Sequence, residues 1–134
     1  MTAHDLRDVP LFAGLSDEGL ARVGSAAVEI RAAPGQPLAL PGHAGSGMFF
    51  LLEGSVTVEL PGGEIEVAAP DFVGELALLL PDNSRIGRVR AATEVRCLSL
   101  AREEFDTLSA SEPSFVLALL RSLAARLAEA RARD

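Results

Sequence analysis

The sequence has no lysine, tryptophan or tyrosine, and it has a single cysteine. That residue, Cys97, allows neither an intramolecular disulfide nor a cysteine-ligated zinc cluster, which favours a reducing compartment. The aromatic residues are six phenylalanines, so stacking platforms for single-stranded nucleic acid are scarce. No apolar run is long enough to cross a bilayer, and no signal peptide is visible near Met1. We therefore expect a cytoplasmic chain that is not embedded in a membrane.

The basic residues are all of one type, and the charges are unevenly distributed along the chain. All 12 basic residues are arginine, and 19 acidic residues give a net charge of −7. Residues 1–84 hold three arginines and twelve acids, whereas residues 85–134 hold nine arginines and seven acids. The net acidity argues against direct binding of nucleic acid or an anionic membrane. The net negative charge is still compatible with a local anion site, because arginine suits bidentate anion recognition.

The chain length of 134 residues and a hydrophobic content of 49% predict one domain, residues 1–134, with its own core. From Val28 onward, glycine or proline recurs every few residues between short apolar or alternating runs. The expected strands are residues 38–40, 48–52, 55–60, 64–68, 88–93 and 95–100. The pattern predicts a mainly β fold with flanking helices: an antiparallel, jelly-roll-like β-roll over about residues 28–100, with a hairpin turn at Gly62-Gly63.

Helices are expected at both ends of this roll. Ser16 is a candidate N-cap for a short helix, and Pro113 begins a segment without glycine that predicts a long helix over 113–133. This segment carries an apolar seam with heptad-like spacing, made of Val116, Leu120, Leu123 and Leu127. The seam is compatible with a helix laid on its own sheet or with a parallel pair in a homodimer. We favour the homodimer, because other apolar residues near the helix start can hold the sheet.

Enzyme motifs are missing. His4 and His43 are the only histidines, and they cannot form the histidine cluster of a cupin-like metal enzyme. Serine hydrolase and Walker-type phosphate motifs are absent, and Cys97 lies in a strand pattern typical of a buried apolar residue. We predict a binding protein with no catalytic residue, bound metal or cofactor.

The informative stretch is residues 70–93. Gly74 permits a positive φ or a close backbone approach and leads into a short helix that begins at Glu75. The amides of such a turn, together with Arg85, would suit one phosphate, and Glu75 would accept a hydrogen bond from a hydroxyl of the same ligand. A ligand with both ribose and phosphate fits this set. The alternative is a Glu75–Arg85 salt bridge across a surface loop.

The stretch resembles the phosphate-binding cassette of the cyclic nucleotide-binding domain, which catabolite activator proteins, protein kinase A regulatory subunits and cyclic nucleotide-gated channels share. The cassette is Phe72-Val-Gly-Glu-Leu-Ala-Leu-Leu, followed by Arg85 and Val89-Arg-Ala. Similar turns occur upstream in family order: Leu11-Phe-Ala-Gly-Leu-Ser, Pro34-Gly-Gln, Pro41-Gly-His and Leu52-Glu-Gly-Ser-Val. Phe105 and the helix led by Pro113 resemble the family's final helices. The resemblance covers about residues 8–133.

The resemblance implies a role for each matching position. Glu75 would bind the ribose 2′-hydroxyl and Arg85 the cyclic phosphate. Backbone groups of Gly74, Leu76 and Ala77 would line the cassette. The expected apolar walls for the base are Leu52 and Val67, with the side chains of Leu76 and Leu79 packed beneath the site.

Departures from the family pattern bear on base selectivity. Ile86 and Gly87 follow Arg85 where the family usually has a small or hydroxylated residue and then alanine. Ile86 still offers a backbone N–H to phosphate. Ala130 lacks the hydroxyl that contacts adenine in the activators, and Arg131 is expected to stack on the base instead.

These observations predict a cyclic nucleotide-binding regulatory domain for cAMP, in preference to cGMP, whose ligand shifts the helix 113–133. The alternative is a degenerate fold that serves as a dimerisation or scaffold module without ligand. We expect no DNA-binding domain within residues 1–134, and Met1 favours a natural N-terminus.

Overall fold

The computed structural model describes residues 6–39, 47–60, 62–79 and 88–132. Its N-terminal elements are η1 (Pro10–Phe12), α2 (Asp17–Ala26), β1 (Val28–Ala32) and β2 (Pro37–Ala39). The middle elements are β3 (Met48–Glu53), β4 (Ser55–Leu60), β5 (Gly63–Ala68), β6 (Phe72–Val73) and α3 (Glu75–Leu79). The C-terminal elements are β7 (Arg88–Ala91), β8 (Val95–Leu100), α4 (Arg102–Ser111) and α5 (Pro113–Ala132). No helix in these ranges is long and apolar enough to cross a membrane.

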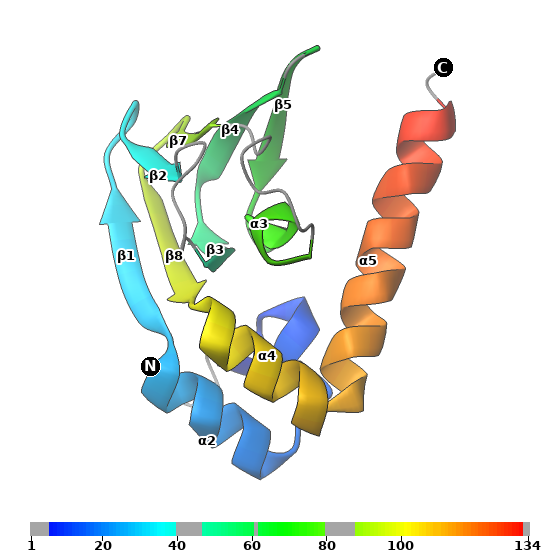
Figure 1. Ribbon diagram of the computed structural model, residues 1–134. Helices are drawn as coiled ribbons and strands as arrows, with labels where there is room; N and C mark the ends of the chain where they lie inside the picture. Colours follow the sequence, from blue (N-terminus) through cyan, green and yellow to red (C-terminus); the bar gives the residue numbers. More distant parts are fainter. Residues whose placement is uncertain (1–5, 40–46, 61, 80–87, 133–134) are drawn as a thin grey trace.

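The strands form two four-stranded sheets in the orders β1-β8-β3-β6 and β2-β7-β4-β5, and every neighbouring pair is antiparallel. Figure 1 shows the sheets as one roll, with α2 and α4 gathered at its end and α5 rising beside it. The prediction of a mainly β roll with flanking helices is confirmed. The hairpin is confirmed as well, since β4 pairs with β5, but Gly63 is the first residue of β5, opposite Leu60, and so does not belong to the turn as predicted.

Strand β3 divides the core, because its successive side chains enter two different clusters. Phe49 and Leu51 lie in the cluster between the sheets, whereas Met48 and Phe50 lie in the cluster shared with the helices. Both faces of this strand are therefore buried. Strand β1 and the two-residue β6 were not among the expected strands, and β7 ends at Ala91, short of the expected residue 93.

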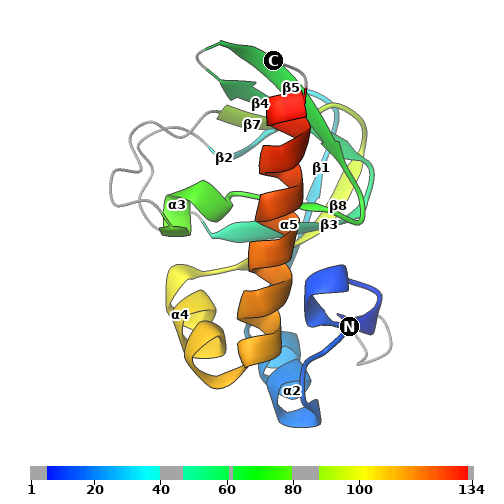
Figure 2. The ribbon, with the colours of Figure 1, turned by 90° about the vertical axis from the view of Figure 1, so that its right-hand side faces the viewer.

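The helices close the second cluster. Ser16 caps α2 as predicted, because its side chain accepts a hydrogen bond from the Gly19 N–H at 3.0 Å. Phe115, in the first turn of α5, packs with ring-centroid distances of 6.2 Å to Phe12 and 5.8 Å to Phe105. The first turns of α5 are therefore part of the core, and the rest of the helix extends past α3 along the roll (Figure 2).

Candidate functional site

The turn into α3 requires glycine at position 74. Gly74 has a φ of +89°, and an added Cβ would lie 2.7 Å from the carbonyl oxygen of Gly47. The sequence predicted a positive φ or a close backbone approach at Gly74, and the structure has both. This turn sets the place of Glu75, the first residue of α3.

A cavity of about 310 Å³ lies between the β4–β5 hairpin, the turn at Gly74 and α5. Figure 1 shows α3 between the roll and α5 at this place. The described residues that line the cavity are Val58, Leu60, Ile65, Val67, Val73, Gly74, Glu75, Leu76, Val89, Leu123, Arg126 and Leu127. Glu75 and Arg126 alone among them are charged. The cavity thus offers apolar walls and one place for polar recognition.

Glu75 is a buried carboxylate, with only 7% of its surface exposed. Its Oε1 accepts a hydrogen bond from Nη1 of Arg126 at 2.8 Å. Burial raises the pKa of the Glu75 carboxyl above its ordinary value, and the charge and hydrogen bond of Arg126 oppose that rise without cancelling it. Buried carboxylates are costly, so their presence beside a cavity marks a candidate binding site.

Arg126 joins α5 to two other segments of the chain. Its Nη2 donates to Oδ1 of Asp71 at 2.7 Å and to the carbonyl oxygen of Phe72 at 2.6 Å. Its guanidinium carbon also lies 4.1 Å from the centroid of the Phe72 ring, which is a cation–π contact. With the bond to Glu75, this one side chain connects the helix to the residues on both sides of the Gly74 turn.

A family profile for the cyclic nucleotide-binding domain matches residues 29–112, which run from β1 to the end of α4. The chain belongs to the cyclic nucleotide-binding domain family. The resemblance stated from the cassette is therefore confirmed, and Gly74, Glu75 and α3 fall within the matched residues.

Relatives of this domain family occur in several kinds of regulator. A cyclic nucleotide-gated potassium channel of Rhizobium etli is 40% identical over 105 residues, which cover 78% of this chain and 29% of the channel. A cAMP-dependent protein kinase regulatory subunit of Emericella nidulans is 33% identical over 106 residues, covering 77% of this chain and 26% of that subunit. The crystal structure of the catabolite activator protein of Thermus thermophilus has a TM-score of 0.74 at 27% identity, covering 92% of this chain and 61% of that one. The chain thus spans less than a third of the length of the two curated relatives.

Four of the residues predicted for the nucleotide site line the cavity: Val67, Gly74, Glu75 and Leu76. Ala77 lies in α3. Arg85, Ile86 and Gly87 lie outside the described residues. The alternative of a surface Glu75–Arg85 pair is not tested there, but Glu75 is buried and already bonded to Arg126.

Three apolar assignments differ from the structure. Leu52 is absent from the cavity wall and packs against the helix-side cluster, because β3 has apolar side chains on both faces and Leu51 is the one between the sheets. Leu76 and Leu79 do not pack beneath the site, since both are substantially exposed. Leu78 takes that place, because it is the buried leucine of α3 and belongs to the helix-side cluster.

The arginine of α5 at the cavity is Arg126 rather than Arg131. Arg131 is exposed, and five positions along a helix with 3.6 residues per turn point its side chain well away from that of Arg126. Sequence reasoning missed Arg126, because nothing in its spacing distinguishes it among the chain's arginines. The nearby Leu123 and Leu127 were identified as an apolar seam, and the structure places both on the cavity wall.

The described residues hold no group of three His, Cys, Asp or Glu side chains able to bind a metal ion. Cys97 is fully buried, as its strand pattern predicted, and burial raises the pKa of its thiol to about 11, which keeps it protonated at neutral pH. The Glu75 carboxylate can accept hydrogen bonds at the cavity, and the other walls can cover an apolar surface.

Proposed function

We propose that this chain is a cyclic nucleotide sensor domain whose ligand occupies the cavity between the β4–β5 hairpin, the Gly74 turn and α5. The observation that carries this proposal is the buried Glu75 carboxylate, held at the start of α3 on an otherwise apolar wall. Glu75 would accept a hydrogen bond from the ribose 2′-hydroxyl. By resemblance to the family cassette, Arg85 would pair with the cyclic phosphate, with the amides of Gly74, Leu76, Ala77, Ile86 and Gly87 nearby.

The base is adenine in this proposal. Apart from Glu75 and Arg126, the described residues of the cavity wall are apolar or glycine. Guanine carries two exocyclic polar groups, a 2-amino group and a carbonyl, where adenine carries one amino group, so burying guanine without polar partners costs more free energy. The similarity to a cAMP-dependent kinase subunit supports the same choice. cAMP is therefore proposed as the ligand, in preference to cGMP.

The output of the sensor would be the docking of α5. The beginning of this helix is anchored, since the Glu112 carboxylate before it accepts bonds from Ser16 and the Ser114 hydroxyl donates to the Gly14 carbonyl. Beyond Ser122, the helix meets the roll at the cavity wall and at Arg126. A ligand that binds more tightly when this part is docked would shift the helix toward the docked position.

A second copy of the chain is the proposed protein partner, with the cytoplasm as the proposed location. Leu117, Leu120 and Leu127 are exposed by 46%, 58% and 52% on one helix, and several exposed apolar side chains together favour an interaction surface. The expected seam included Val116 and Leu123, but Val116 is half-buried and Leu123 packs against the helix-side cluster. The surface proposed for a helix pair is therefore Leu117 and Leu120, together with Leu127, which also lines the cavity.

Calorimetric titration of the chain with cAMP, cGMP and 5′-AMP tests the proposed function. We expect saturable binding of cAMP, weaker binding of cGMP, and weaker binding again of 5′-AMP, whose open phosphate lacks the ring ester. In parallel thermal melts, a ligand at 100 times its Kd should stabilise the fold by about 2.7 kcal/mol. Absence of both heat and thermal shift with millimolar cAMP or cGMP would contradict the proposal.

A further inference from the structure

The strands at the ends of the two sheets differ in how well they are protected from pairing with another strand. Among the described strands, β1 and β6 end one sheet, and β2 and β5 end the other. An edge strand presents unpaired N–H and C=O groups that another strand can bind. Strand β2 has three residues and begins with Pro37, which has no N–H to donate. The β2 edge is therefore a poor template for pairing.

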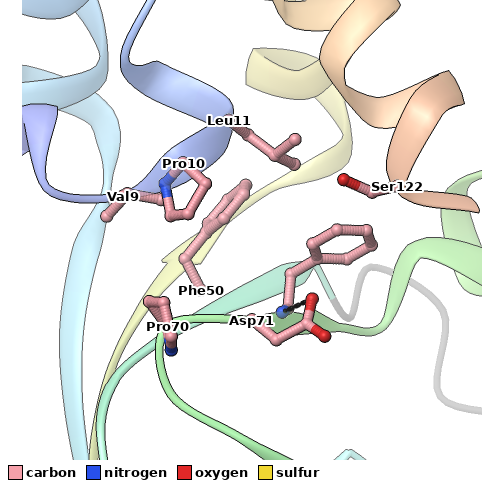
Figure 3. A pocket seen from close by; sticks show the side chains of 8 residues that line it. Val9, Pro10, Leu11, Phe50, Pro70, Asp71 and Ser122 are labelled. Atoms are coloured by element: carbon pink, nitrogen blue, oxygen red, sulfur yellow. Dashed lines mark hydrogen bonds between the residues drawn. The ribbon is translucent and has the colours of Figure 1, made fainter. Parts of the chain in front are cut away.

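The edge at β6 is occupied by other parts of the chain. The N–H of Phe72 in this two-residue strand donates to Oδ1 of Asp71 at 2.8 Å. The carbonyl oxygen of Phe72 accepts a bond from Nη2 of Arg126 at 2.6 Å. Figure 3 shows Asp71 beside a cavity of about 260 Å³ that Leu11 and Ser122 of α5 also line. Side chains thus take the backbone groups of Phe72, and η1 and α5 lie next to this edge.

Strand β5 is longer and exposed, but its charges oppose pairing with a second copy. Glu64 and Glu66 lie on either side of Ile65. An antiparallel pair of two β5 strands centred on any of these three residues would place two glutamates directly opposite each other. Like charges in that position destabilise a strand pair. The β5 edge is therefore protected against self-association.

Strand β1 has the opposite charge pattern. Its five residues, Val28–Ala32, include no proline, and among the described residues their backbone pairs with β8 alone. Figure 1 shows this strand at the margin of the roll, on the side away from α5. Glu29 and Arg31 flank Ile30 at the centre of the strand. An antiparallel pair centred on Ile30 would place Glu29 of each copy opposite Arg31 of the other.

The charged face of β1 would gain from such a pair. Arg31 lies opposite Arg96 of β8, so two like charges are neighbours on this face. Arg96 bonds at 3.0 Å to both Glu29 and Glu53. Arg31 lies 3.6 Å from Glu29, and 70% of its side chain is exposed. Glu29 of a second copy would give Arg31 an additional acidic partner.

The apolar face of β1 would gain as well. Val28, Ile30 and Ala32 lie on the same side of the sheet, because side chains alternate along a strand. Ala32 is buried, whereas Val28 is 60% exposed. The pair would place Val28 opposite Ala32 of the second copy, a small residue that leaves room for it. Removing this apolar surface from water favours association.

We propose that β1 is a second self-association surface, through which two copies pair as antiparallel strands and join their four-stranded sheets edge to edge. The inference does not depend on the nucleotide site. A five-residue strand pair buries far less than the roughly 1,600 Å² of a standard interface, so the contact is weak. At the micromolar concentrations of sedimentation velocity it would stay dissociated. Together with the helix pair on α5, it would link dimers into larger assemblies.

The experiment is sedimentation equilibrium of the Leu120→Ser chain without nucleotide, at chain concentrations up to about 1 mM. Leu120→Ser removes the proposed helix pair, so the remaining association reports on β1. Arg31→Glu in this background should weaken association at least about tenfold, because glutamates then face each other at both ends of the pair. Arg88→Glu is the matched control, since Arg88 is exposed on the interior strand β7 and the change of charge is the same. The control should stay within about twofold.

Exchanging the charges tests the register of the pair. Glu29→Arg should weaken self-association as Arg31→Glu does, because two arginines then face each other. In an equimolar mixture of the two variants, arginine faces glutamate at both ends of the mixed pair. The mixture should therefore recover the association of the Leu120→Ser chain.

The outcomes are independent of the calorimetric test of the proposed function, because no nucleotide is present. A Leu120→Ser chain that stays monomeric over the whole concentration range overturns the strand pair. Equal weakening by Arg31→Glu and Arg88→Glu also overturns it, because the contact then lies elsewhere. A mixture that does not recover association overturns the register centred on Ile30. Should Glu29→Arg not fold, salt decides: about 1 M NaCl screens charges beyond about 3 Å and must narrow the difference between Arg31→Glu and its parent, and an unchanged difference overturns the charge pairing.

Discussion

Nη1 of Arg126 lies 2.8 Å from Oε1 of Glu75, across 51 positions of sequence, and this bond joins α5 to α3. This pair places a cation of the last helix on the carboxylate for which we propose a ribose contact. It connects the part of the chain that would receive the nucleotide to the part that would report its presence.

The substitution Glu75→Gln should affect stability and ligand binding differently. Because burial raises the pKa of Glu75 in the folded state, the folded chain binds a proton more tightly than the unfolded chain does. The stabilising contribution of the protonated group is present at low pH and lost as pH rises through the folded-state pKa. We expect the variant to melt at or above the wild-type temperature at pH 7.5. As pH falls toward 5, the melting temperature of the wild type should rise relative to that of the variant.

The same variant should bind cAMP about 10- to 100-fold more weakly at neutral pH, because the hydrogen bond to a charged acceptor is lost. Thermal melts over the pH range and calorimetry at pH 7.5 measure the two effects. A variant that melts much lower than the wild type at every pH, with unchanged affinity, would show that Glu75 serves the fold and not the ligand.

Gly74→Ala should destabilise the fold by about 1–3 kcal/mol in urea unfolding, since alanine meets both a strained φ and the Gly47 carbonyl. Two control variants separate these causes. Gly35→Ala has the same sign of φ, at +90°, but open space around an added Cβ, and Gly62→Ala has open space without the positive φ. We expect the order of destabilisation to be Gly74, then Gly35, then Gly62. Equal stability of the Gly74 and Gly62 variants would contradict the assignment of a tight turn.

Short sequence patterns were enough to predict the turns and the helix start of this fold. The hairpin followed from Gly62-Gly63 between alternating runs, the start of α2 from Ser16, and the turn at Gly74 from its position before a short helical run. The hairpin and the cap depend on residues close in sequence, and Gly74 carries its own signal in its positive φ, although the Gly47 carbonyl that it approaches is distant in sequence. The cassette resemblance then identified Glu75, which the structure places on the cavity.

Other features depend on packing that no local pattern encodes. Residues 48–52 are all apolar, so alternation could not tell which side chains of β3 enter the roll, and Leu52 was assigned to the wrong face. The rotation of α5 about its axis is set by Phe115 and Leu119 in the core. That rotation brings Arg126 to Glu75 and turns Arg131 away, and spacing within the helix does not reveal it.

Arg85→Ala should weaken cAMP binding by about 1.5–3 kcal/mol, as expected for the loss of charge-assisted bonds to a phosphate. Arg85 lies outside the described residues, so the prediction rests on its match to the family cassette. Arg88→Ala is the control, because Arg88 is an exposed arginine at the start of β7, close in sequence. Calorimetry that gives equal affinity for the wild type and Arg85→Ala would refute the assignment of the phosphate contact.

Leu120→Ser should shift the chain from dimer to monomer in sedimentation velocity. Leu120 is the most exposed of the three exposed leucines on α5 and does not line the cavity, so serine should cost little stability while it removes apolar area from the proposed helix pair. Val28→Ser is the matched control, because Val28 is 60% exposed on β1, at the sheet edge. A dimer that survives Leu120→Ser but dissociates with Val28→Ser would place the interface on β1. A wild type that sediments as a monomer at every concentration, with and without cAMP, would remove the helix pair altogether and leave the exposed leucines to another partner.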